Sequence, residues 1–199
     1  MADYFVEGGD VLENKLGVTD SEQLQKIEEN VFSDAALDVV NEDFSDSELN
    51  FDFLKSLHRR LFGKLYYFAG QIRTVNITKT DSSIPFCMAD FIVPEASRIF
   101  GNLKSKNYLK ELPREKFANE LAGLAIELNA LHPFREGNGR TIRLYLQLLA
   151  CNAGYLIDYA SLSHAEIVEA DKQAFLGNDA KIKELYRRIV LPIDLRSAA

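Results

Sequence analysis

Two apolar helical patterns, separated by a short polar segment, place the strongest constraint on how this chain can fold. In residues 117–131 apolar side chains recur at helical spacing, and in residues 142–149 they surround nearly the whole predicted helix. A helix that is apolar all round must be covered by other elements, so residues 142–149 are expected at the centre of a helical bundle. The linking residues 132–143 are thereby held between two buried helices.

The rest of the chain predicts a mainly α-helical single domain over residues 1–199. Thr19 and Glu22 form a predicted capping box at the start of the first helix, and residues 1–18 before it predict an irregular arm. Helical spacing or helix-end signals mark residues 19–40, 53–63, 66–70, 92–103, 163–177 and 182–192.

One stretch departs from helical spacing and predicts a β-hairpin. Residues 72–77 are rich in β-branched side chains, turn-forming residues follow, and residues 84–87 are apolar again. An isolated hairpin adds little core to a helical protein, so a functional role is favoured over a purely structural one.

The Gly-Asn-Gly sequence at residues 137–139 is suited to binding phosphate. Two closely spaced glycines let successive backbone N–H groups point into one concavity, and the helix that follows adds the positive end of its dipole. Arg140 and Arg143 lie three residues apart at the start of that helix. Both guanidinium groups are therefore expected to project toward the same end and to bind phosphate oxygens.

Two further residues of the segment bring metal-binding and acid–base chemistry. Glu136 precedes the phosphate site, where a bare carboxylate would repel phosphate unless a hard cation such as Mg²⁺ lay between them, so it is the predicted metal ligand. His132 can accept a proton from an attacking hydroxyl near neutral pH. A single histidine beside an apolar helix is more often structural, and only the combination with the other groups favours catalysis.

Residues 132–143 match the signature His-x-Phe-x-(Asp/Glu)-Gly-Asn-Gly-Arg-x-x-Arg at every fixed position, and through it the chain resembles the Fic family of nucleotidyl transferases. The resemblance implies a Fic-type helical bundle with a small β-hairpin flap and a core of about residues 50–190. It implies that His132 deprotonates a target hydroxyl and that Glu136 holds Mg²⁺. The implied nucleotide-binding residues are Gly137, Asn138, Gly139, Arg140 and Arg143.

The residue at position 139 bears on the reaction that the resemblance implies. Related Doc-type proteins carry a lysine there, which is associated with reversed nucleotide binding and phosphorylation of the target. Gly139 instead favours a protein adenylyltransferase, which transfers AMP from ATP to a Ser, Thr or Tyr hydroxyl of a target protein. The alternatives are another nucleotide donor, removal of AMP, or a catalytically idle nucleotide-binding module, although an idle module would be expected to lack His132 or Glu136.

In Fic proteins the hairpin position is a flap that pairs with the backbone of the target, a form of β-augmentation. By this resemblance Lys79, Thr80 and Phe86 are assigned to target binding.

Many Fic proteins carry an inhibitory helix with the pattern (Ser/Thr)-x-x-x-Glu-(Gly/Asn), whose glutamate pairs with the second arginine of the motif, here Arg143. The nearest string in this chain runs from Gln25 to Glu29 and Asn30, with glutamine where Ser or Thr belongs. This mismatch predicts that a separate small antitoxin inserts the inhibitory glutamate near Arg143, and that the chain is the toxin of a toxin–antitoxin pair.

Charge and cysteine content limit the kinds of binding partner and the cellular compartment that can be expected. A net charge of −7 and a pI near 5.1 argue against a surface built for nucleic acid. Cys87 and Cys151 form no metal-binding or disulfide pattern, which favours a cytoplasmic protein. The chain has no run of 18 apolar residues and no basic-then-apolar start, so no membrane partner is expected, while secretion into a host cell by specialised machinery stays open.

Overall fold

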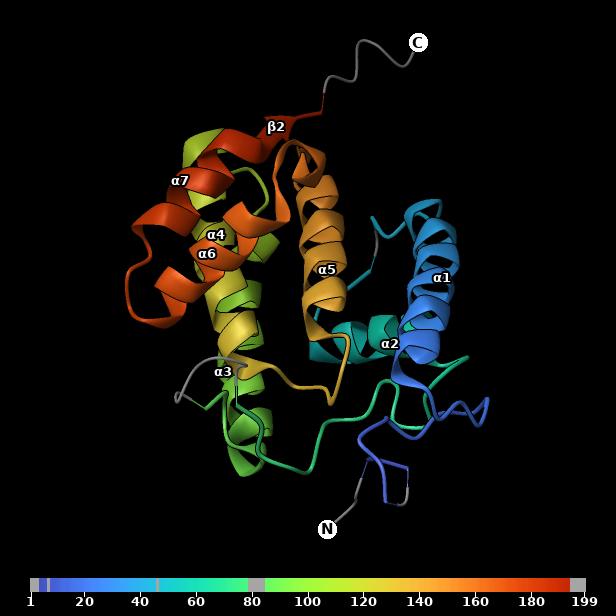
Figure 1. Cartoon of the computed structure of the whole chain (residues 1–199). Helices are drawn as coiled ribbons and strands as arrows, with labels where there is room; N and C mark the ends of the chain where they lie inside the picture. Colours follow the sequence, from blue (N-terminus) through green and yellow to red (C-terminus); the bar gives the residue numbers. More distant parts are fainter. Residues whose placement is uncertain (1–3, 7, 46, 79–84, 194–199) are drawn as a thin grey trace.

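The computed structural model of the chain describes residues 4–6, 8–45, 47–78 and 85–193, and this part is mainly α-helical (Figure 1). The α-helices are α1 Ser21–Val40, α2 Phe51–Phe62, α3 Ile92–Ser105, α4 Arg114–Leu131, α5 Asn138–Asn152, α6 His164–Phe175 and α7 Ala180–Ile189. Short 3-10 turns occupy Ala89–Phe91, Asn107–Leu109 and Tyr159–Ser161. The predicted mainly α-helical fold class is confirmed. Within the described ranges, no helix combines the length and apolar character that a membrane span needs.

Helices α4 and α5 lie at the centre of the molecule (Figure 1). Helices α6 and α7 pack on α4 from one side, while α2 packs on α5 and α1 packs on α2. Leu121, Leu128, Tyr145 and Leu149 of the two central helices are completely buried. Because both helices are fixed by this packing, the segment between them has well-anchored ends.

A small antiparallel sheet joins the chain after α5 to the chain after α7. Strand β1, Tyr155–Ile157, pairs with β2, Val190–Pro192, and Leu156 lies opposite Leu191. Neither strand was predicted from the sequence, because three residues are too few to show a two-residue period.

The predicted β-hairpin is much reduced in the described residues. The stretches 72–77 and 84–87 were expected as paired strands, but the described structure has one isolated antiparallel bridge, between Thr78 and Pro85. Residues 79–84, which include the predicted turn, lie outside the described residues.

The two stretches share one backbone hydrogen bond, from the N–H of Phe86 to the carbonyl of Ile77 (3.2 Å), and each also bonds to the region at the end of α4. The N–H of Arg73 donates to the carbonyl of Pro133 (2.9 Å), and the N–H of Cys87 donates to the carbonyl of Ala130 (2.9 Å). Backbone groups used in this way are no longer available for a strand ladder. The two stretches are thus attached directly to the His132 region.

Two helical predictions also need correction. Helix α1 begins at Ser21 and is capped by Asp20, whose carboxylate accepts a first-turn N–H at 2.7 Å, and not by Thr19. Aspartate is as good an N-cap as Ser or Thr, and here it lies directly before the helix. Residues 66–70 form turns and not a helix, because the N–H of the last residue donates to Nδ1 of His58 (2.8 Å).

The N-terminal arm packs against the loop that follows α2. The N–H of Lys15 donates to the carbonyl of Leu65 (2.8 Å), and Phe5 bridges to Leu12. The guanidinium of Arg135 lies 4.8 Å from the centre of the Phe5 ring. The arm therefore reaches the segment between α4 and α5.

Candidate active site

His132 ends α4 in a left-handed backbone conformation, with φ 44° and ψ 61°. This conformation is uncommon for a residue other than glycine and persists only where its surroundings hold it. The His132 N–H donates to the carbonyl of Leu128 (3.0 Å), and the His132 carbonyl accepts a hydrogen bond from Nε of Arg73 (2.8 Å). These two contacts end the helix and turn the chain into the next segment.

Arg73 is 1% exposed and acts as a clamp on carbonyl groups. Besides His132, its guanidinium donates to the carbonyls of Val75 (2.7 Å), Cys87 and Leu131 (3.5 Å). Burial lowers the pKa of this guanidinium from its usual value. A cation is nevertheless favoured here because it faces the carbonyl end of α4, the negative end of the helix dipole.

The imidazole of His132 has a defined proton arrangement. Its Nδ1 lies 3.3 Å from the carbonyl oxygen of Asn129. A carbonyl can only accept, so Nδ1 donates in this contact, and in the neutral ring Nε2 then carries the lone pair. The ring also stacks on Phe86, with centroids 3.8 Å apart and an angle of 13° between the planes. This is the tautomer and the restraint that a general base requires.

Two hollows lie near this imidazole. One of about 380 Å³ opens beside Phe86, between α3, α4 and α6. The other, of about 30 Å³, lies beside Gly139 and Arg143, between α5, α6 and α7. Asn129 lines both. The larger hollow thus reaches Phe86, whose ring stacks on the His132 imidazole.

Phe134 and Asn138 give the loop between α4 and α5 its shape. Phe134 is completely buried. Its N–H donates to Oδ1 of Asn138 (2.9 Å), and Nδ2 of Asn138 donates to the Phe134 carbonyl (2.8 Å). Asn138 was predicted to bind phosphate, but its side chain is committed to the loop. Its backbone N–H, the first of α5, has no acceptor within the helix and is the group suited to an anion.

His58 on α2 supports the same loop. It is completely buried and accepts the N–H of Gly70 at Nδ1 (2.8 Å), so its Nε2 proton donates to the carbonyl of Glu136 (2.9 Å). Burial lowers the pKa of His58 to about 4. The ring is thus neutral at physiological pH, and it fixes the backbone just before the glycine pair.

Gly137 adopts a conformation and a position that only glycine fits. Its φ is +76°, and a Cβ atom there would lie 2.5 Å from Cε2 of Phe62. The Gly137 N–H donates to the Glu136 carboxylate at 2.8 Å. A phosphate bound at the start of α5 would therefore compete with this carboxylate for the N–H.

Gly139 lies in contact distance of Arg143. A Cβ atom at position 139 would lie 3.3 Å from Nη1 of Arg143. A Cβ atom here would require the guanidinium to move by a few tenths of an ångström, and glycine requires no such movement.

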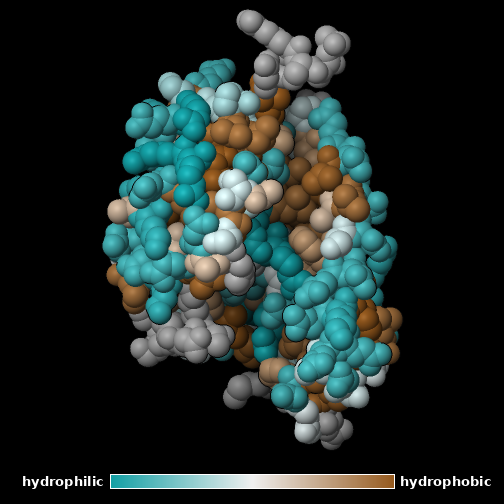
Figure 2. Space-filling model, turned by 45° about the horizontal axis from the view of Figure 1, so that its top comes forward, coloured by the Kyte–Doolittle hydropathy of each residue, from teal (hydrophilic) through white to brown (hydrophobic). Residues whose placement is uncertain are grey.

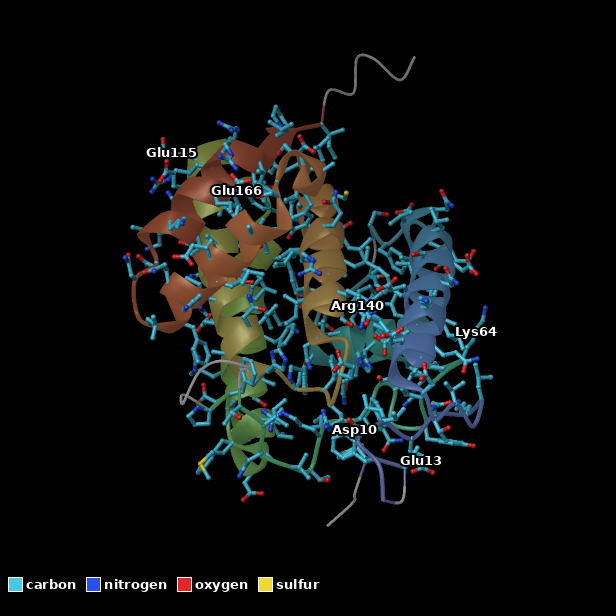
Figure 3. The ribbon with its side chains drawn as sticks, viewed as in Figure 1. Asp10, Glu13, Lys64, Glu115, Arg140 and Glu166 are labelled. Carbon is cyan, nitrogen blue, oxygen red and sulfur yellow. The ribbon has the colours of Figure 1, made fainter. Side chains whose placement is uncertain are left out.

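Arg140 and Arg143 face different neighbours, which differs from the sequence expectation. Arg143 lines the smaller hollow near α6 and α7, whereas Arg140 points from α5 toward α1 (Figure 3). There Nη2 of Arg140 forms an ion pair with Glu28. Residues three apart on a helix lie about 60° apart around its axis. Carboxylates that bind only one of the two arginines are therefore enough to separate the two guanidinium groups.

The predicted flap residues are only partly described. Phe86 lies against His132 as stated above, next to the site. Lys79 and Thr80 lie outside the described residues, so their assignment to target binding stays a prediction.

Three polar residues at the site were not assigned to it by sequence: Glu28, His58 and Arg73. Glu28 and His58 each interrupt the apolar face of an amphipathic helix, where a buried polar group needs a partner. That interruption is a usable signal, although it does not identify the partner. Arg73 follows a loop and gives no comparable pattern.

Glu136 fits the predicted Mg²⁺ site only in combination with a nucleotide. Among the described residues, no three His, Cys, Asp or Glu side chains are grouped to hold a metal ion by themselves. The Glu136 side chain is 45% exposed and offers one carboxylate. Mg²⁺ commonly binds through one carboxylate together with substrate phosphates and water, and this donor set is compatible with that mode.

The family description of the Fic/DOC proteins matches residues 48–150 of this chain. The chain belongs to the Fic/DOC family. The match covers α2 to α5 and includes the motif, whereas α1, α6 and α7 lie outside it.

Curated relatives of this Fic/DOC chain carry a common functional name. A protein of Sinorhizobium fredii named "Probable protein adenylyltransferase y4lH" is 33% identical over 92% of this chain and 93% of its own length. The protein adenylyltransferase VbhT of Bartonella schoenbuchensis is 34% identical over 89% of this chain, which corresponds to 37% of VbhT.

Solved structures of Fic domains have the same fold. The BepC protein of Bartonella tribocorum with bound AMPPNP has a TM-score of 0.90 at 26% identity, over 96% of this chain and 97% of BepC. The Fic domain of a VirB-translocated Bep effector of Bartonella quintana with bound ADP has a TM-score of 0.93 at 26% identity, over 98% of both chains. The resemblance inferred from the motif is thereby confirmed at the level of family and fold.

Proposed function

We propose that this chain transfers AMP from ATP to a Ser, Thr or Tyr hydroxyl of a target protein. Its enzyme class, protein adenylyltransferase, is confirmed by the names of relatives that cover about nine tenths of the chain. The observation that carries the specific proposal is the His132 imidazole, whose Nδ1 contacts the carbonyl of Asn129, six residues before α5 begins at Asn138.

The reaction needs one base and one phosphate-binding surface. Nε2 of His132 accepts the proton of the target hydroxyl, whose oxygen bonds to the α-phosphorus of ATP while the bond to pyrophosphate breaks. The products are an AMP ester of the target and pyrophosphate. Because the base does not take part in gripping the nucleotide, proton removal and nucleotide binding are separable functions.

The backbone N–H groups at residues 137–139 are proposed to receive the phosphates, with help from Arg140 and Arg143. Glu136 would hold Mg²⁺, which supplies charge neutralisation at the phosphates when bound. Gly139, at the position where Doc-type proteins carry a lysine, supports AMP transfer over phosphate transfer.

The flap region is proposed to bind the target. Phe86 supports this proposal because it lies directly against the His132 ring. Lys79 and Thr80 would extend the same surface, where an exposed backbone edge binds an extended segment without a strict sequence requirement.

The test uses ATP labelled on the α- or the γ-phosphate, incubated with Mg²⁺, the purified chain and cell extract. Protein-bound α-label that disappears on chelating Mg²⁺ is expected. His132→Ala should reduce this labelling about 10²–10⁴-fold while the Kd for ATP stays within about twofold, because only the base is lost. Label from the γ-phosphate would indicate a kinase, and no label with intact ATP binding would indicate an idle module.

We further propose that a separate small protein restrains the enzyme and that the chain acts as a toxin in the cytoplasm. Glu29, the nearest match to an inhibitory glutamate, is exposed on α1, where its carboxylate accepts a hydrogen bond from Gln25 (3.1 Å). Leu37 and Val40 of α1 are 62% and 51% exposed. On the face shown in Figure 2, hydrophobic surface lies in the middle, between hydrophilic left and right sides. Exposed apolar surface of this kind favours a protein partner.

The control proposal is tested with the chain alone. Expression without a partner should arrest cell growth, and His132→Ala should relieve the arrest. A chain that is silent alone and becomes active on Glu29→Gly would show that the inhibitor is internal.

A further inference from the structure

Glu28 lies outside the family match and contacts one of the two motif arginines. It lies on α1, before residue 48, and is 8% exposed. Its Oε1 pairs with Nη2 of Arg140, which is 112 residues further along the chain. Figure 3 shows Arg140 between α5 and α1. Helix α1, which lies outside the motif, therefore helps to set the direction of Arg140, the first motif arginine.

The carboxylate of Glu28 is itself fixed from its other side. The hydroxyl of Tyr66 donates to Oε2 of Glu28. The pKa of Tyr66 is raised above its usual value, mainly by burial and next by this hydrogen bond to a carboxylate. Tyr66 is 2% exposed, so the donor cannot move far. Both oxygens of Glu28 are thus engaged, and its position is set by α1 and by the loop after α2.

The guanidinium of Arg140 is also restrained by aromatic rings. Its Cζ atom lies 4.9 Å from the ring centre of Phe62 and 5.5 Å from that of Phe32. These distances are in the range of cation–π contacts. Glu136 lies 3.7 Å from the same Nη2 atom but is 45% exposed, so its contribution is weak. Glu28 is the dominant anchor.

This anchoring leaves most of the arginine's hydrogen-bonding capacity for a ligand. A guanidinium has five N–H donors, and the contacts with Glu28 and Glu136 use Nη2. Nε and Nη1 carry three further donors. A guanidinium held by one nitrogen and two ring contacts presents these donors in one orientation, which lowers the entropic cost of binding phosphate.

We propose that Glu28 is a positioning residue that orients Arg140 for the phosphates of the nucleotide. The proposal rests on the proposed function, in which Arg140 binds phosphate. A rival role, in which Glu28 competes with phosphate for Arg140, fits less well. The Glu28 carboxylate is held by Tyr66 in a buried position, and displacing it would leave a buried charge without its cation.

The two roles predict opposite changes in nucleotide affinity. The Kd for ATP is measured for the full chain and for Glu28→Gln, Arg140→Ala and the double variant. Glu22→Gln is the matched control, because it removes the same charge from an exposed position on the same helix. If Glu28 positions Arg140, Glu28→Gln should weaken ATP binding roughly tenfold, about 1.4 kcal/mol, and should have no further effect in the Arg140→Ala background.

Several outcomes would overturn the proposal. Tighter ATP binding by Glu28→Gln would make Glu28 a competitor, and an unchanged Kd with a lower Tm would make it only structural. Equal weakening of adenosine, which lacks phosphates, would also contradict a role through Arg140. Should Glu28→Gln not fold, Tyr66→Phe tests the same point, since it releases one oxygen of Glu28 and should weaken ATP binding but not adenosine binding. A wild-type chain that binds ATP and transfers no AMP would refute the proposed function without affecting this readout.

Discussion

The neutral state of His58 should make folding stability depend on pH in a defined window. His58 accepts a backbone N–H at Nδ1, so protonating that nitrogen would place a second proton against the donor. The pKa is about 4 in the folded chain and near 6.5 in the unfolded chain. Between these values the unfolded chain binds more protons, so the free energy of unfolding falls as pH falls.

The size of this effect follows from the gap between the two pKa values. Each pKa unit corresponds to about 1.4 kcal/mol, so His58 accounts for a loss of about 2 kcal/mol by pH 5 and about 3 kcal/mol at pH 4 and below. The contribution of neutral His58 to the free energy of unfolding is complete above about pH 6.5. It is lost progressively below that pH.

The measurement is urea unfolding of the wild type and His58→Asn at pH 7.5, 6 and 5. Carboxylates titrate in both proteins and cancel in the difference. The stability gap between the two proteins should therefore shrink by about 2 kcal/mol between pH 7.5 and 5. An NMR titration should find the His58 ring neutral at pH 5. A gap independent of pH, or a ring that protonates near pH 6.5, would refute the reasoning.

Two further predictions concern residues that hold the motif. Arg73→Met should lower kcat for AMP transfer at least about tenfold and change the Kd for ATP much less. The reason is that Arg73 supports the left-handed His132 and no nucleotide-binding group. Equal losses in kcat and in ATP affinity would contradict this role. Gly137→Ala should destabilise the fold by about 2 kcal/mol or more in chemical unfolding, because the added methyl meets the Phe62 ring and φ is positive. Gly101→Ala is the matched control, since it lies in a helix with open space at its Cβ position and should be neutral or stabilising.

Helices and the motif were largely predictable from sequence. Helix hydrogen bonds join residues four apart, so the periodic apolar pattern of α4 and the Gly-Asn-Gly start of α5 carry the information locally. The chemistry of residues 132–143 is equally local, because the base, the carboxylate and the glycines lie within a few residues of one another.

Short or weakly periodic elements were predicted poorly. The capping position of α1 was displaced by one residue, and the three-residue strands β1 and β2 left no pattern to detect. Among the described residues the expected hairpin strands share one bridge, and the N–H groups of Arg73 and Cys87 bond to the region at the end of α4, a competition that local propensity does not contain.

Only the tertiary structure decided how the motif is held. His132 depends on Arg73, 59 residues away, and the Glu136 carbonyl on His58, 78 residues away. The direction of Arg140 depends on Glu28. A buried polar group must find a partner, and sequence can therefore signal that a partner exists. Which atom serves as the partner is set by helix packing, because two groups distant in the chain meet only when the core places them within hydrogen-bonding distance.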